Sequence, residues 1–340
     1  MRLTALLSFA VLSIASCAPS SPPVRRAAVG FAIPKLDPPS RTSVDSVVIV
    51  TLDGARWQEI FQGPEELMPT LHRWMTLDGV GIGAPGHGEV WSSGPNFVSL
   101  PGYTEIFTGR RSRCQSNECG PIDEPTLVDE VQDRGFDAAV VSSWERLARA
   151  ASRAPSRVTL STGRHVTGRT DAFAPESLAA GRDGGPWPGS DDYRPDALTM
   201  RVALDLVATH LPQVLFVGLG DMDEHAHHGD HARYLESLRA ADGFLHELEE
   251  RLPARTAIFV TADHGRNAAF RDHGGGWHES GRVWLVVKGA GSARGFVDMG
   301  IRHLADIAPT VRCLLGMPPD VGEGSGESIE LLCPSGDTHE

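Results

Sequence analysis

Apolar residues form four short continuous runs along the chain. The runs, at residues 44–52, 138–141, 214–219 and 258–261, contain β-branched side chains and are bounded by polar or turn-forming residues. Runs of this length and composition are typical of strands that are covered on both faces. The pattern therefore predicts a core of buried, mostly parallel strands.

Segments with helical spacing of apolar residues lie before three of these strands. They span about residues 125–135, 195–210 and 235–252; a proline opens the first two and soon follows the last two. Proline fits the first turn of a helix and cannot continue a helix past its end. Repeated helix-then-strand units predict an α/β fold, with a mostly parallel central sheet and helices on both faces.

Residues 152–193 interrupt this alternation. They have little apolar periodicity and are rich in Gly, Arg, Asp and Pro. A stretch of this length and composition is expected to be an insertion or lid. We therefore predict one large α/β domain over residues 43–340, with an inserted lid at about residues 152–193.

Residues 1–17 have the pattern of an export signal. A short positive start precedes an apolar run at residues 6–14 that is too short to span a membrane, and small residues precede Cys17. This resembles a bacterial lipobox, which implies lipidation of Cys17 and, because Ala18 follows it, sorting to the outer membrane. The alternative is an ordinary signal peptide that is cut nearby. Residues 18–42 are rich in Pro, Ser, Arg and Ala and predict a flexible tether, so we expect a lipid-anchored protein of the bacterial periplasm or outer membrane.

Four further cysteines favour disulfides, since an even count in an exported chain is typical of cross-links. Cys114 with Cys119 would close a small loop and Cys313 with Cys333 would pin the C-terminal tail, although sequence alone allows other pairings. A zinc cluster is the rival reading, but finger-like spacing is missing. The formal net charge of −13 argues against a nucleic-acid partner. No apolar run after the signal reaches membrane-spanning length, so membrane attachment would be through the lipid.

Acids and histidines follow two of the predicted strands. The stretch at residues 257–273, AIFVTADHGRNAAFRDH, ends its strand on Asp263 and His264, and His273 comes nine residues later. Asp53 follows the first strand in the same way, where a carboxylate can bind a cation or cap a helix. The carboxyl ends of parallel strands meet at one edge of a sheet, where binding sites form. These residues are therefore candidates for one site.

Residues 220–231, GDMDEHAHHGDH, contain four histidines within seven positions. The pairs Asp223 with His227 and Asp221 with His225 have a spacing that puts an acid and an imidazole on one side of a helical turn. Such a density of Asp and His is costly unless it is solvated or holds a metal. Nonspecific metal binding by a His-rich surface tract is the alternative.

Ser99 precedes a Leu-Pro-Gly turn, and residues 103–107 can begin a helix whose free N–H groups face an anion near the serine. Its hydroxyl could attack phosphorus if a metal lowered its pKa. A serine at this place can equally be an ordinary turn residue.

In order and spacing, these motifs resemble the alkaline phosphatase superfamily of two-metal phosphoesterases and sulfatases, and most closely its type I phosphodiesterase/nucleotide pyrophosphatase group. The resemblance covers about residues 44–317 and includes MPTL at 68–71 and DIAPT at 306–310. It implies an alkaline phosphatase-like fold and an exported metal-dependent phosphoric ester hydrolase, either a phosphodiesterase or a phosphomonoesterase.

The family pattern implies a role for each candidate. Ser99 matches the nucleophile and also contacts one metal. The ligands of that metal match Asp53, Asp263 and His264. The ligands of the second metal match Asp223, His227 and His273. A two-residue slip would replace the first two of these by Asp221 and His225, and His278 is the fallback for His273.

Two divalent ions about 4 Å apart would activate the Ser99 hydroxyl and stabilise the leaving oxygen. Zinc is favoured because it suits imidazole and carboxylate ligands together, and manganese would accept the same set.

Two departures from the family pattern bear on the substrate. Sulfatases need Arg where this chain has Tyr103, which implies an unmodified serine and phosphate chemistry. Nucleotide pyrophosphatases usually carry an Asn that binds the phosphate three places after the nucleophile, and this chain has Gly102 there. Asn96 or Arg56 would then take that role. The partner would be a phosphorylated small molecule, lipid or glycan, with monoester, diester and phosphonate all open. The alternatives are a metal-containing surface lipoprotein that binds phosphorylated ligands without turnover, or a transferase of phosphorylated headgroups, whose relatives usually carry membrane helices.

Overall fold

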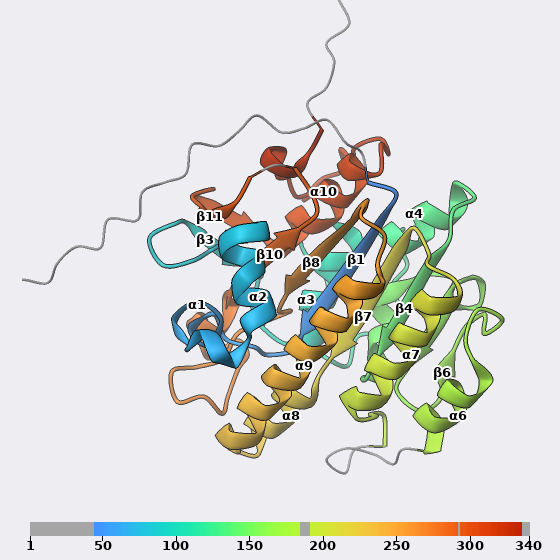
Figure 1. Ribbon diagram of the computed structural model, residues 1–340, viewed down its shortest axis with the longest axis horizontal. Helices are drawn as coiled ribbons and strands as arrows, with labels where there is room; N and C mark the ends of the chain where they lie inside the picture. The colour runs from blue at the N-terminus through green and yellow to red at the C-terminus, as the bar shows by residue number, and fades with distance from the viewer. Residues whose placement is uncertain (1–43, 184–190, 292, 335–340) are drawn as a thin grey trace, which may run out of the picture. The chain divides into compact units, whose positions relative to one another are not determined.

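The computed structural model describes residues 44–183, 191–291 and 293–334 (Figure 1). The predicted signal peptide at residues 1–17 with its lipidation site Cys17, and the predicted tether at residues 18–42, lie outside the described residues. Among the helices that the structure describes, none is long and apolar enough to cross a membrane.

Within the described residues, nine strands form one sheet in the order β11-β2-β10-β8-β1-β7-β4-β5-β6. Its centre is four parallel strands, which are β8 (Thr256–Thr261), β1 (Ser46–Leu52), β7 (Val214–Leu219) and β4 (Ala138–Ser142). Every residue of these four strands is buried, as expected for apolar runs that are covered on both faces. The predicted α/β fold with a mostly parallel sheet is confirmed.

The outer strands complete the sheet. On one side β5 (Thr159–Thr162) is parallel to β4, and β6 (Val166–Thr167) is antiparallel to β5. On the other side β10 (Leu285–Lys288) is antiparallel to β8 and to β2 (Gly79–Ile82), which pairs with β11 (Gly295–Val297). A small second sheet joins β12 (Ile301–His303), β3 (Glu89–Trp91) and β9 (Arg282–Val283).

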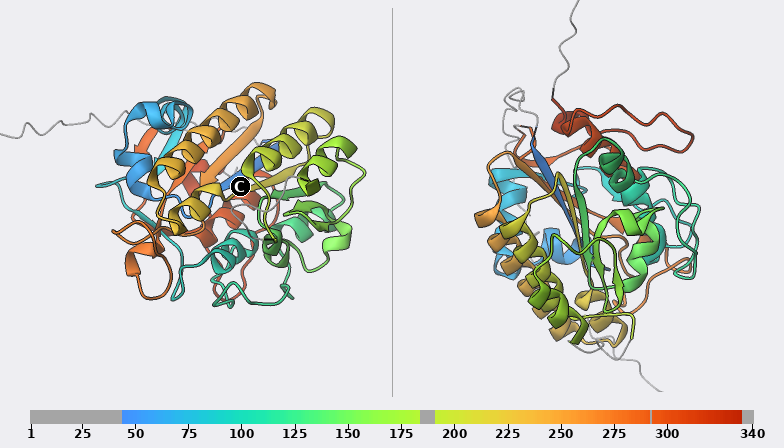
Figure 2. Two further views of the ribbon diagram at one scale, coloured as in Figure 1. Left: turned by 90° about the horizontal axis from the view of Figure 1, so that it is seen from below. Right: turned by 90° about the vertical axis from the view of Figure 1, so that its right-hand side faces the viewer.

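Helices cover both faces of the large sheet (Figures 1 and 2). One face is covered by α1 (Trp57–Gln62), α2 (Pro69–Arg73), α6 (Pro175–Asp183), α7 (Asp196–Thr209), α8 (Asp221–His227) and α9 (His231–Arg251). The other face is covered by α3 (Ser99–Thr108), α4 (Leu127–Asp133), α5 (Ala148–Ala151) and α10 (Ile307–Leu314). The three helices predicted from apolar spacing are present as α4, α7 and α9.

The predicted insertion at residues 152–193 includes regular structure where the chain is described. It contributes β5 and β6 to the edge of the sheet and α6 to one face. Its role as a lid stays a prediction.

Both predicted disulfides are present. Cys114 pairs with Cys119 and Cys313 pairs with Cys333, with Cα–Cα distances of 5.9 and 5.8 Å. The first closes a small loop after α3, and the second joins α10 to the C-terminal tail.

Candidate active site

The carboxyl ends of β1, β7 and β8 lie side by side, because β1 pairs in parallel with both neighbours. Leu52 of β1 is in register with Leu219 of β7, and Thr51 with Thr261 of β8. The segments that follow these strands begin with Asp53, with α8 and with Asp263. The fold therefore brings the three predicted acidic motifs to one edge of the sheet.

The first cluster consists of Asp53, Asp263 and His264, all of them buried. Their ligand atoms all lie within 4.8 Å of one another. Nε2 of His264 is 3.4 Å from Oδ1 of Asp53 and 3.6 Å from Oδ2 of Asp263. Because Nδ1 of His264 lies 2.9 Å from the carbonyl of Gly265 and can donate to it, Nε2 is left with its lone pair facing the acids.

Two carboxylate oxygens of this cluster lack hydrogen-bond partners. The hydroxyl of Tyr103 donates to Oδ2 of Asp53 at 2.8 Å, and the amide of Gly54 donates to Oδ1 of Asp263 at 3.2 Å. The other oxygens, Oδ1 of Asp53 and Oδ2 of Asp263, are buried and have no partner among the described residues. Burial and the nearby Asp223 carboxylate raise the pKa of Asp53 to about 7, and burial and Asp53 raise the pKa of Asp263 well above its ordinary value.

The two carboxylate oxygens are costly by themselves, because no hydrogen-bond donor among the described residues reaches them. The imidazole nitrogen beside them has the Ser99 hydroxyl at 3.3 Å. A divalent cation would satisfy all three at once, and this oxygen and nitrogen donor set suits zinc or manganese. The residues of the first cluster therefore fit a divalent metal.

Ser99 is the first residue of α3 and its hydroxyl oxygen lies 3.3 Å from Nε2 of His264. The helix begins here and not at residue 103, because Pro101 lies in the first turn, where a helix needs no N–H from it. Gly102 explains how α3 approaches the end of β8 so closely. A Cβ at this position would lie 2.2 Å from the carbonyl oxygen of Asp263, so the place where Asn was expected has no room for a side chain.

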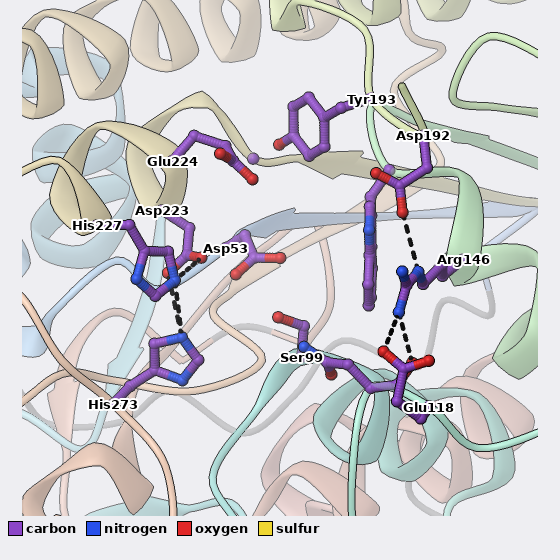
Figure 3. Close-up of a pocket in the computed structure, with 13 residues that line it drawn as sticks. Asp53, Ser99, Glu118, Arg146, Asp192, Tyr193, Asp223, Glu224, His227 and His273 are labelled. Carbon is purple, nitrogen blue, oxygen red and sulfur yellow. Dashed lines mark hydrogen bonds and ion pairs between the residues drawn. The ribbon is translucent and has the colours of Figure 1, made fainter. Parts of the chain in front are cut away.

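The second cluster consists of Asp223, His227 and His273 (Figure 3). Nε2 of His227 is 3.0 Å from Oδ2 of Asp223 and 3.1 Å from Nε2 of His273. Nδ1 of His273 lies 3.0 Å from the carbonyl of Phe97, and the ring stacks on His264 with centroids 3.8 Å apart. Asp223, His264 and His273 also offer ligand atoms within 4.8 Å of one another, so the two clusters adjoin.

Arg266, to which no sequence motif pointed, joins the second cluster to the loop after β8. Its Nη1 contacts Oδ1 of Asp223, while its Nε and Nη2 donate to the carbonyls of Phe270 and Arg271 at 2.7 and 2.8 Å. Although burial acts in the opposite direction, Arg266 and the two histidines hold the pKa of Asp223 well below its ordinary value. This buried guanidinium therefore fixes both Asp223 and the loop that ends at His273.

The fallback pair Asp221 and His225 faces away from both clusters. With Asp196 it lines a different cavity, of about 530 Å³, on the α7 side of α8. Oδ1 of Asp221 accepts the amide of Asp196 at 3.1 Å, and the Asp196 carboxylate accepts the amides of Gly220 and Asp221. The two carboxylates thus cap each other's helices, and the alternative pairing is not at the metal clusters.

Three other candidates, His278, Asn96 and Arg56, also lie away from the two clusters. His278 is exposed and its ring packs on Trp91 at 4.9 Å. The Asn96 amide donates to the carbonyl of Gln115 at 2.8 Å, and Arg56 pairs with Glu59. The structure therefore brings none of the three to the candidate site, and the suggested oxygen-binding roles of Asn96 and Arg56 are not supported.

The clusters open into a cavity of about 290 Å³ (Figure 3). Ser99, Asp53 and the second cluster form one wall. Glu224 of α8 also lines it. The other wall comes from segments that no sequence motif pointed to, with Asn117, Glu118, Trp144, Arg146, Asp192 and Tyr193. Nε of Arg146 donates to Asp192 at 2.9 Å, and its Nη1 contacts Glu118. In the sequence these residues are marked only by their places: between two paired cysteines, just after β4, and at the end of the predicted insertion.

Sequence comparison gives matches over the C-terminal part of the chain. Residues 191–319 match the family model "Metalloenzyme superfamily". The phosphopentomutase of Carboxydothermus hydrogenoformans is 30% identical over 148 residues, which are 43% of this chain and 36% of that protein. The phosphopentomutase of Herpetosiphon aurantiacus is 29% identical over 124 residues, 36% of this chain and 31% of that protein. The chain thus matches only about a third of the length of these curated relatives.

Solved structures resemble the fold over most of the chain. The alkaline phosphatase PafA has a TM-score of 0.61 at 12% identity and covers 86% of this chain and 100% of its own. The 2-O GAG sulfatase BT1596 has a TM-score of 0.61 at 12% identity, with 87% and 76% covered. The phosphonate monoester hydrolase of Agrobacterium radiobacter has a TM-score of 0.55 at 15% identity, with 87% and 78% covered. These identities establish the fold alone, and the narrower phosphodiesterase branch stays a prediction.

Proposed function

Because residues 191–319 match the Metalloenzyme superfamily model and the chain has the alkaline phosphatase-like fold, we propose that it is a metal-dependent phosphoric ester hydrolase with Ser99 as its nucleophile. The observation that carries the proposal is the position of the Ser99 hydroxyl, 3.3 Å from Nε2 of His264 and beside two buried carboxylates with unpartnered oxygens. A purely structural metal site would need the ligands but would not need a hydroxyl at this point.

The first cluster, Asp53, Asp263 and His264, would hold one divalent ion, and Asp223, His227 and His273 would hold the second. When bound, such ions lower the pKa of a nearby hydroxyl and neutralise charge on a phosphoryl group. Zinc is the favoured ion for this ligand set, and manganese is the alternative.

The chain's own groups supply orientation and charge. Ser99 at the start of α3 is directed at the ligand cluster and would take the phosphoryl group, which water then removes. The partial positive charge at the N-terminus of α3 favours the approach of an anion to this hydroxyl. Tyr103 holds Asp53 through a 2.8 Å hydrogen bond and so fixes the orientation of that carboxylate.

Asn117 and Arg146 are better candidates for binding the phosphoryl oxygens than Asn96 and Arg56. Oδ1 of Asn117 accepts the amide of Leu100 at 2.9 Å, which fixes the side chain beside Ser99 and leaves its NH₂ group as a donor. Among the described residues that line the cavity, Arg146 is the one with a guanidinium, and it lies on the opposite wall. A cationic donor there favours a phosphomonoester, whose phosphoryl group carries the most charge.

The substrate class follows from the size and polarity of the cavity. Its volume is about 290 Å³, and it is lined by the carboxylates of Glu118 and Asp192, which pair with Arg146, and by that of Glu224 on α8. Such a lining suits a small hydroxyl-bearing group and offers little apolar surface to a lipid chain. We therefore favour a small polar phosphate ester over a phosphorylated lipid.

The exported, lipid-anchored location in the bacterial cell envelope remains part of the proposal. Two disulfides support it, because such bonds persist mainly in oxidising compartments. A lipid on Cys17 would be detected as a mass increase and as partition of the full chain into detergent.

The test is metal analysis of protein that lacks residues 1–17, with hydrolysis of p-nitrophenyl phosphate and its bis-ester before and after chelation. We expect two divalent ions per chain, faster turnover of the monoester, and loss of turnover on chelation with recovery when the metal is restored. Bound metal without turnover of either ester would favour the lipoprotein that only binds phosphorylated ligands. Absence of metal would refute the proposal.

A further inference from the structure

A small loop closed by the disulfide Cys114–Cys119 lies at the cavity. The two cysteines are five residues apart, and the loop supplies Asn117 and Glu118 to the cavity wall. The loop therefore has a direct place in the candidate site, although neither cysteine is a ligand or a nucleophile.

The loop connects two parts of the cavity that are separate in the sequence. Towards α3, Oδ1 of Asn117 accepts the amide of Leu100, the residue after Ser99, at 2.9 Å. Towards the segment after β4, Glu118 binds Nη1 of Arg146, and the Asn117 carbonyl accepts from the same nitrogen at 3.3 Å (Figure 3). Displacement of the loop would therefore release the nucleophile's neighbour and the cavity arginine together.

Polar bonds from neighbouring segments also reach this loop. The Asn96 amide donates to the Gln115 carbonyl at 2.8 Å, and the Cys114 amide donates to the Ser112 hydroxyl at 3.1 Å. Gln115, Ser116 and Glu118 are exposed, and the internal backbone bond from Cys119 to Ser116 is long at 3.4 Å. Its outer end is held through Arg149, which donates to the Cys119 carbonyl at 3.1 Å. Cys114 and Cys119 pack against the core, whereas the polar bonds of the exposed residues compete with water, so the cross-link is what limits the conformational freedom of the segment between them.

We propose that the Cys114–Cys119 disulfide is a positioning element of the active site, which holds Asn117 beside Ser99 and Glu118 on Arg146. Opening it lowers turnover and leaves metal binding intact, because the metal ligands come from the ends of β1, β7 and β8 and from the loop after β8. The turnover part of this inference rests on the proposed function.

The chain offers a matched control in its second disulfide. Cys313–Cys333 joins α10 to the C-terminal tail, and neither cysteine lines the cavity. Removing this bond affects the tail without touching Asn117, Glu118 or Arg146.

The experiment compares the wild-type chain with the double variants Cys114→Ser/Cys119→Ser and Cys313→Ser/Cys333→Ser, at a temperature where circular dichroism shows all three to be folded. For the first variant we expect kcat/KM for the preferred ester to fall by about tenfold or more, since small displacements of positioning groups have effects of this size. Metal content should stay at the wild-type value. The second variant should keep wild-type kcat/KM within about twofold.

Hydrogen exchange gives a readout that does not depend on turnover. Opening the first disulfide should speed exchange of the Leu100 amide, which loses its bond to Asn117, while the amides of α9 keep their wild-type rates. Unchanged exchange at Leu100 would overturn the inference, and so would a loss of metal on opening the loop. If the wild-type chain hydrolyses no ester, the proposed function fails, and the exchange of Leu100 alone decides whether the disulfide positions Asn117.

Discussion

The two ligand clusters differ in how far the protein has already compensated their charges. In the first cluster His264 has no exposed surface, and two carboxylate oxygens beside it have no partner among the described residues. In the second, the His227 side chain is 44% exposed, and Asp223 is already paired with Arg266. The first cluster therefore gains more from a cation than the second does, because without one the buried Asp53 and Asp263, whose pKa values are raised, must hold protons instead.

The two clusters should therefore bind their ions with different strength. A buried, uncompensated ligand set gains most from an ion, since no other group neutralises it. A partly exposed set that shares its carboxylate with an arginine binds an ion less tightly and leaves room for solvent or substrate. We expect the first place to retain its metal on dialysis more strongly than the second.

Ser99→Ala should have the largest effect on turnover. The change removes the nucleophile and leaves every carboxylate and imidazole of the first cluster in place. We expect turnover to fall by about 10³-fold or more, while metal content stays at the wild-type value. Steady-state kinetics and metal analysis on the same preparation provide the check, and wild-type activity in this variant would contradict the role of Ser99.

Asp263→Asn tests the first cluster itself. We expect turnover to fall by about 10³-fold and the tightly held metal to be lost, because an amide cannot replace the carboxylate charge that binds the ion. Without metal, the substitution should stabilise the protein. The variant should then unfold at a higher temperature than the wild type, since it no longer buries an uncompensated carboxylate, a difference worth about 1–3 kcal/mol. Thermal melts with and without chelator measure both effects, and normal metal stoichiometry would move the ligand role to another residue.

The central strands and their terminal acids could be predicted from the sequence because their signals are local. A buried strand is visible as an apolar run, and an acid that follows it must lie at the sheet edge. Asp53 and Asp263 could be located in this way. The choice of Asp223 over Asp221 could not be made on physical grounds, since both share the same spacing to a histidine. It depends on the capping contact of Asp221 with Asp196, which lies 25 residues away.

The outer wall of the cavity had no such local signal. Asn117 and Arg146 lie in segments without periodicity, and their roles arise from contacts with α3 and Asp192 that only the fold creates. Asn96 and Arg56 were the two residues suggested for binding a phosphate oxygen, but the Asn96 side chain bonds to Gln115 and Arg56 pairs with Glu59. The start of α3 was placed too late because Pro-Gly is typical of a turn, yet both residues fit the first helical turn against β8.

Arg266→Met addresses the second cluster and should act mainly on stability. Removing the guanidinium leaves Asp223 buried beside no permanent cation, which costs about 3–5 kcal/mol when one partner of a buried pair is lost. Bound metal would compensate part of this charge, so we expect the loss of stability to be smaller with metal than without it.

Arg266→Lys is the matched control, because it keeps the charge and loses the planar bonds to the loop. It should preserve more of the metal-free stability than Arg266→Met. Equal destabilisation of the metal-free and metal-loaded forms in Arg266→Met would show that Asp223 does not take part in metal binding.

The pH dependence of the metal-free chain should show the smallest effect. Asp53 and Glu105 have pKa values raised by burial to about 7 and about 8, so above their unfolded values the folded state holds protons that the unfolded state has released. Stability must then fall as pH rises towards these values. Burial lowers the pKa values of His264 and His273 to about 4 and about 3, so these two groups make stability rise with pH. They do so only up to about pH 6.5, above which the unfolded chain also leaves them neutral.

Other groups add to the slope from Asp53 and Glu105 in the same direction. Burial raises the pKa of Asp221 to about 9, that of Glu224 to about 7 and that of Asp263 well above its ordinary value, and the Asp223 carboxylate raises the pKa of His227. We expect the free energy of unfolding of the chelated protein to decrease by at least about 2 kcal/mol between about pH 6.5 and 8.5, measured by urea denaturation. Glu105→Gln removes the contribution from α3. Adding metal to this variant should reduce the remaining slope by the contribution of the first cluster, whereas Asp221, which faces away from both clusters, keeps its own contribution. A slope that metal does not change would mean that the ionised carboxylates of the first cluster are not what the ion neutralises.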